Sequence, residues 1–76
     1  MEFKPHGIDE TFIAERIDEL RIRKGVSEYK MSLDMGHSKN YIQNIRTKRS
    51  SPSLSEFFNI CNYLETTPTD FFNNKK

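Results

Sequence analysis

The chain has 76 residues, which suits one domain near the lower size limit for folding without metals or disulfides. Its single cysteine, Cys61, excludes an intramolecular disulfide, and no apolar run approaches membrane-spanning length, so we expect a cytoplasmic protein. The net charge is only +1, but residues 1–20 carry −4, residues 21–49 carry +6 and residues 50–76 carry −1. Such a basic segment favours binding to a phosphate backbone, although a solvated basic face would have the same composition.

The first eight residues differ from the rest of the chain. They contain Pro5 and Gly7 and show no helical periodicity. We therefore predict a flexible N-terminal arm over residues 1–8 and one folded domain over residues 9–76.

A first helix is predicted from a cap at Asp9 or Thr11 to about Lys24. Gly25 suits the left-handed residue that ends a helix. The apolar residues of this helix recur at spacings of four and three, which places them on one buried stripe. They are Ile13, Ile17 and Leu20.

Residues 27–45, SEYKMSLDMGHSKNYIQNI, predict two short helices joined by a tight turn. Ser27 is a suitable cap for the first of them, and Gly36 ends it after about two turns. Ser38 is expected to cap the next helix, the third of the chain, which extends to about Arg46.

The third helix has two different faces at about 100° per residue. One face and the preceding helix supply apolar residues to a shared core, namely Met31, Met35, Ile42 and Ile45. The opposite face carries Asn40, Gln43, Asn44 and Thr47. A rigid helix that offers several amides from one face suits the reading of base edges in the DNA major groove, although any exposed helix is polar.

Two further helices follow a polar, basic loop over residues 47–52. Ser53 and Glu56 have the spacing of a capping box, and Thr67 with Pro68 marks the start of a short fifth helix. The buried stripe of the fourth helix is Phe57, Ile60, Cys61 and Leu64. Because no strand pattern or repeat is present, the predicted fold is all-α, a compact five-helix bundle with a helix-turn-helix.

The stretch IDELRIRKGVSEYKMSLDMGHSKNYIQNI resembles the lambda-repressor-like helix-turn-helix family, also called Cro-type or XRE-type. The basic loop, the Pro52-Ser53-Leu54 entry to the fourth helix and the closing LETTPTDFF agree with it. The resemblance covers about residues 13–73 and implies a domain that binds double-stranded DNA with its third helix.

By resemblance, base contacts come from the first turn and outer face of the third helix. The positions are Lys39, Asn40, Gln43 and Asn44. The chemistry of these residues agrees, because Asn and Gln can pair bidentately with adenine and Lys can donate to guanine.

A second group of residues is suited to phosphate contacts, which position a protein on DNA without specifying sequence. The group is Ser27, Ser38, Tyr41, Arg46, Thr47, Lys48 and Arg49. For Ser27 and Ser38 capping is expected to be the main role, and a phosphate could share the same helix N-terminus. Tyr41 lies at the edge of the apolar side, where it could be partly buried instead. His37 is expected to pack in the turn.

Several positions depart from the family pattern. Glu28 stands where the family usually has a glutamine that contacts phosphate, and Ser32 replaces the usual alanine. Arg46 and Lys48 stand where the family often has a glutamate, which pairs with the arginine matching Arg21, and then a glycine. We therefore expect that ion pair to be absent and Arg46 to be free for a phosphate contact that partly offsets Glu28.

These features predict a sequence-specific transcriptional regulator, most simply a small repressor of bacterial, phage or mobile-element type that occupies an operator. A homodimer is expected, with Phe71 and Phe72 in the dimer contact. The alternative is a protein-interaction module on the same fold, such as the antitoxin of a toxin–antitoxin pair. Glu28, the acidic first helix and the closing phenylalanines favour that alternative.

An enzyme is not expected. The two histidines, His6 and His37, lie in the arm and in the turn, and Cys61 falls on a buried stripe. No nucleophile–base pair, metal-ligand spacing or phosphate-binding glycine loop is present, so we expect no catalytic residue, metal, cofactor or small-molecule ligand.

Overall fold

The computed structural model describes residues 10–73, which form five α-helices and no strand. The helices are α1 (Glu10–Lys24), α2 (Glu28–Asp34), α3 (Tyr41–Arg46), α4 (Leu54–Tyr63) and α5 (Pro68–Phe72). The predicted all-α fold is confirmed. The predicted arm, the possible cap Asp9 and the arm residue His6 lie outside the described residues.

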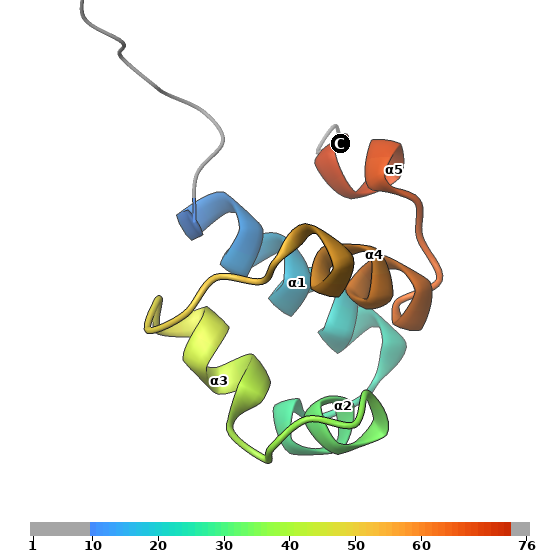
Figure 1. Ribbon diagram of the computed structural model, residues 1–76. Coiled ribbons are helices and arrows are strands. Elements are labelled where there is room, and N and C mark those ends of the chain that lie inside the picture. The colour runs from blue at the N-terminus through green and yellow to red at the C-terminus, as the bar shows by residue number, and fades with distance from the viewer. Residues whose placement is uncertain (1–9, 74–76) are drawn as a thin grey trace, which may run out of the picture.

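The helices surround one core (Figure 1). Helix α2 packs on α3, α1 packs on α3, and α5 packs on α4. In the view of Figure 1, α1 and α4 cross the middle of the molecule, with α2 and α3 below them and α5 above. Over the described residues, no helix has the length and apolar character needed to cross a membrane.

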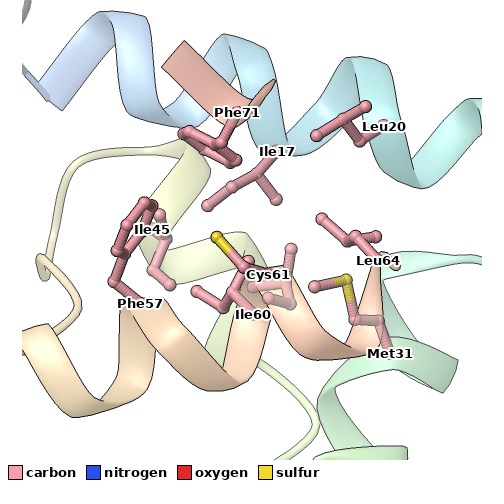
Figure 2. Packing of buried hydrophobic residues seen from close by; sticks show 10 residues of the cluster. Ile17, Leu20, Met31, Ile45, Phe57, Ile60, Cys61, Leu64 and Phe71 are labelled. Carbon is pink, nitrogen blue, oxygen red and sulfur yellow. The ribbon is translucent and has the colours of Figure 1, made fainter. Parts of the chain in front are cut away.

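Ten buried residues form the hydrophobic core, and each of the five helices or its cap contributes at least one (Figure 2). They are Ile17, Leu20, Met31, Ile42, Ile45, Phe57, Ile60, Cys61, Leu64 and Phe71. Ile13 and Met35 are partly buried against this core. The predicted apolar stripes are therefore confirmed. Burial also raises the pKa of the Cys61 thiol, which keeps it protonated.

Three predicted helix starts are confirmed by their hydrogen bonds. The Ser27 hydroxyl oxygen accepts from the backbone N–H of Lys30 at 3.0 Å. At α4, the Ser53 hydroxyl accepts from the Glu56 N–H at 3.1 Å, and the Ser53 N–H donates to the Glu56 carboxylate at 3.2 Å, which completes the capping box. Thr67 caps α5 in the same way, so short polar side chains satisfy these N-terminal N–H groups.

Four helices are followed by a residue in the left-handed region. Gly25 has φ +83° and Gly36 has φ +80°, as their positions predicted, whereas Lys48 at +65° and Glu65 at +59° are not glycines. At each of the four ends the backbone N–H one residue further on donates to a carbonyl of the last turn, which is the Schellman arrangement. A side chain in this region costs about 1–2 kcal/mol, and the closing hydrogen bonds offset that cost.

The start of α3 differs from the prediction. Ser38 does not cap the helix, because α3 begins at Tyr41, and only the Ser38 carbonyl takes part, accepting from the Tyr41 N–H at 3.1 Å. Asn40 occupies the cap position but makes no side-chain capping hydrogen bond.

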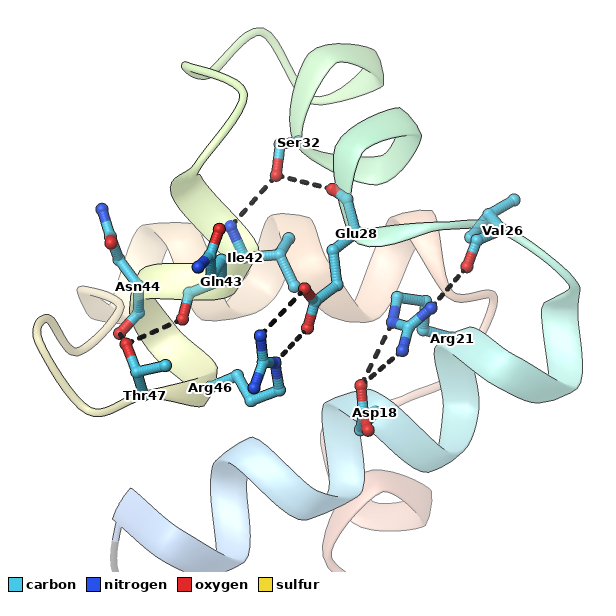
Figure 3. Close-up of polar contacts among 10 residues, drawn as sticks. All are labelled: Asp18, Arg21, Val26, Glu28, Ser32, Ile42, Gln43, Asn44, Arg46 and Thr47. Carbon is cyan, nitrogen blue, oxygen red and sulfur yellow. Dashed lines mark hydrogen bonds and ion pairs between the residues drawn. The ribbon is translucent and has the colours of Figure 1, made fainter.

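A serine from α2 supplies the missing cap. The Ser32 hydroxyl is fully buried, accepts from the backbone N–H of Ile42 at 3.0 Å and donates to the Glu28 carbonyl at 2.7 Å (Figure 3). It satisfies one of the N–H groups that a helix start leaves without an intrahelical partner. The hydroxyl therefore ties α2 directly to the first turn of α3.

Candidate nucleic-acid interface

The residues predicted to contact bases lie at the start and on the outer side of α3. Lys39, Asn40 and Gln43 are exposed, and Asn44 is half-buried. Lys39 and Asn40 precede the helix instead of forming its first turn, because α3 begins later than expected. The arrangement still offers one ammonium and three amides beside each other, on the side of α3 away from the buried isoleucines.

Two hydroxyl groups predicted to contact phosphate differ in what they have left to donate. The Thr47 hydroxyl lies near the backbone carbonyls of Gln43, at 3.0 Å, and Asn44, at 3.4 Å, so its proton is already used (Figure 3). The Ser27 hydroxyl accepts a hydrogen bond as the cap of α2, which leaves its own proton for an anion. Ser27 is thus the better placed donor.

The loop after α3 carries unpaired positive charge. Lys48 and Arg49 are exposed, as is Lys39 at the other end of the helix. None of the three forms an ion pair with another described residue. These side chains can therefore approach a phosphate backbone without breaking an internal contact.

Arg46 is not free, and the expectation that it would be is wrong. Its Nε donates to Glu28 Oε2 at 2.5 Å and its Nη2 to Glu28 Oε1 at 3.4 Å (Figure 3). The hydrogen bond to Glu28 and its charge raise the pKa of Arg46. Arg21 does not pair with position 46 and instead donates to Asp18 Oδ1 at 2.6 Å and to the Val26 carbonyl at 2.8 Å. Contact between Arg46 and phosphate stays a prediction.

Tyr41 is partly buried, one of the two alternatives for this side chain. Its hydroxyl donates to Glu56 Oε1 at 3.1 Å, and its ring stacks on His37 with the centroids 3.7 Å apart. Burial, and then the hydrogen bond to Glu56, raise the pKa of Tyr41. His37 therefore packs in the turn, as expected.

Over residues 10–73, no three His, Cys, Asp or Glu side chains are grouped so as to hold a metal ion.

The two closing phenylalanines have different environments. Phe71 is fully buried, so it has no surface to offer a partner, and its place in a dimer contact is corrected. Phe72 remains 36% exposed and stacks on Phe12 with the ring centroids 5.9 Å apart. It lines an apolar hollow together with Leu54, which is also exposed.

A buried arginine that the sequence analysis did not single out holds this end of the molecule. Arg16 Nε donates to the Phe71 carbonyl at 2.6 Å, and its Nη2 donates to the Asp70 carbonyl at 2.9 Å. These carbonyls lie in the last turn of α5, where the Asp70 carbonyl also accepts from the Asn73 N–H at 3.2 Å. The guanidinium group of Arg16 has several N–H donors and can donate a hydrogen bond to both carbonyls.

Residues 16–76 match the family model of the Cro/C1-type helix-turn-helix DNA-binding domain. The chain belongs to this family, as the resemblance implied, and its class is that of DNA-binding regulators. No significant match was found among curated proteins or among solved structures.

Proposed function

We propose that this protein is a sequence-specific transcriptional repressor that reads the major groove with α3 and acts by occupying an operator. The observation that carries the proposal is a group of polar side chains at the start and outer side of α3, three of them exposed and one half-buried. The side chains are Lys39, Asn40, Gln43 and Asn44. In a helix-turn-helix domain these positions face the base edges, where an amide can pair bidentately with adenine.

The unpaired cations around α3 supply affinity that does not depend on sequence. Lys48 and Arg49 follow the C-terminal end of α3, and Ser27 caps α2, the helix that crosses the DNA backbone in this architecture. Each phosphate contact releases condensed counterions, so binding is expected to weaken steeply as salt rises.

The protein is proposed to act as a homodimer. Phe72 and Leu54 expose apolar surface in one hollow of the domain, and a second copy could cover it. Two helix-turn-helix domains related by a two-fold axis bind half-sites about 34 Å apart. The operator is then expected to be an inverted repeat.

Two alanine variants separate base contacts from phosphate contacts. Asn44→Ala is expected to cost about 1–3 kcal/mol on the preferred duplex and almost nothing on random duplex. Lys48→Ala is expected to weaken both duplexes alike and to reduce the salt slope by about one. Fluorescence anisotropy titrations at several salt concentrations measure both effects.

Two control variants are taken from the C-terminal ends of α4 and α1. Asn62→Ala and Lys24→Ala remove an exposed amide and an exposed cation away from α3, and neither is expected to change binding. Equal losses on specific and random DNA for both Asn44→Ala and Lys48→Ala would contradict the assigned roles.

A further inference from the structure

Glu28 places a carboxylate at a point where negative charge is unfavourable for binding DNA. It is the first residue of α2, and α2 is the helix expected to cross the phosphate backbone. Its side chain is 23% exposed, so the carboxylate is not removed from the surface. Its charge is instead balanced by Arg46 at the end of α3, through the two hydrogen bonds already described.

The surroundings of this ion pair are electrically balanced. A shallow hollow is lined by Asp18, Arg21, Ser27, Glu28, Tyr29 and Arg46. Each arginine in it is paired with one acid, Arg21 with Asp18 and Arg46 with Glu28. The other cations at the ends of α3 have no acid partner among the described residues. Of the cations at the two ends of α3, Arg46 is therefore the one that is paired with an acid among the described residues.

We propose that Glu28 limits the affinity for DNA by holding Arg46 in an ion pair that competes with the phosphate backbone. The inference rests on the proposed function, because it concerns how the same surface meets DNA. A guanidinium group can present the same two-pronged fork to a carboxylate or to a phosphate. Arg46 is 46% exposed, so it can exchange one partner for the other without unfolding the helix.

Arg46 can therefore contact a phosphate only when it leaves Glu28. When Arg46 contacts DNA, Glu28 is left as an unpaired anion close to the phosphate backbone. The repulsion between them reduces the binding free energy that the Arg46–phosphate contact contributes. Removing the carboxylate abolishes the competition. The affinity and the number of counterions released should then both increase.

The test measures binding of wild type, Glu28→Ala, Arg46→Gln and the double variant to one random-sequence duplex over a range of salt. Alanine is chosen at position 28 because a glutamine amide could itself donate to a phosphate. Glu28→Ala is expected to bind about three- to tenfold more tightly than wild type at low salt, with a salt slope steeper by about one. The gain should disappear in the Arg46→Gln background.

Glu65→Ala is the matched control. Glu65 is also an exposed acid next to a helix end and is paired with one cation, Lys24 at 3.5 Å, but it follows α4 and its partner belongs to α1, so neither lies on α2 or α3. The Glu65→Ala variant removes the same charge as Glu28→Ala and should leave DNA binding nearly unchanged.

Three results would overturn the inference. Glu28→Ala could bind no more tightly than Glu65→Ala, which would show that Glu28 does not restrain Arg46. The gain could persist in the Arg46→Gln background, which would show that Glu28 acts on the backbone by direct repulsion. If no variant and no wild-type protein bound any duplex, the proposed function would fail as well, a result distinct from the first two.

Discussion

Single residues define the contact between α2 and α3, and Ser32 is the clearest case. A serine inside a helix is usually exposed or bonded to its own helix, and nothing local indicates a partner elsewhere. Here its hydroxyl also caps α3 through Ile42, which lies ten residues further along the chain. In the sequence, Ser32 is visible only as a departure from the usual alanine, because its role depends on a contact that forms when the helices pack.

Replacing this serine tests that role. Ser32→Ala leaves the buried N–H of Ile42 without an acceptor, and the free energy of unfolding should fall by about 1–3 kcal/mol. Urea denaturation measures the change. Ser55→Ala removes an exposed hydroxyl from α4 and should stay within about 0.5 kcal/mol of wild type. Equal stability of the two variants would mean that the hydroxyl does not cap α3.

At the scale of the helices, what could be predicted depended on how far apart the interacting residues are in the chain. The caps at Ser27, Ser53 and Thr67 act within three residues, so their signals are local and the three helix starts were predicted. The partner of Arg46 is Glu28, eighteen residues away, and no local pattern indicates that pair. The late start of α3 has the same origin, since its cap comes from another helix.

A hydrogen bond between helices predicts how stability changes at alkaline pH. The Tyr63 hydroxyl of α4 donates to Asp34 of α2 at 2.7 Å, which raises the pKa of Tyr63 to about 12. The folded state thus favours the protonated hydroxyl. The stabilisation is present in full below the pKa of an unfolded tyrosine, about 10, and is lost as the pH rises through the folded value.

Tyr63→Phe isolates this contribution. Wild type should melt at a higher temperature than Tyr63→Phe near neutral pH, and the difference should shrink above about pH 10. Thermal melts followed by circular dichroism between neutral and alkaline pH measure it. Tyr29→Phe, at an exposed tyrosine, should show no such dependence. A difference that stays constant across this range would argue against the hydrogen bond.

At the scale of the whole molecule, the uneven charge of the sequence corresponds to an uneven surface. Helix α1 carries four acidic and four basic residues, which balance in charge, whereas Lys39, Lys48 and Arg49 lie at the two ends of α3. The family and the five-helix fold were predicted from sequence because helix periodicity, caps and turn glycines agree with each other. The base and phosphate contacts around α3 stay predictions, whereas the structure shows that Phe71 belongs to the core and that Arg46 is paired with Glu28.

The proposed dimer and its reading of two half-sites rest on the apolar hollow beside Phe72 and on the polar side of α3. The most direct test is selection of binding sites from a randomised duplex pool at about physiological salt. We expect enrichment of an inverted repeat whose half-sites lie one helical turn, about 34 Å, apart. Failure to enrich any sequence would contradict base reading by α3 and would turn the search toward a protein partner.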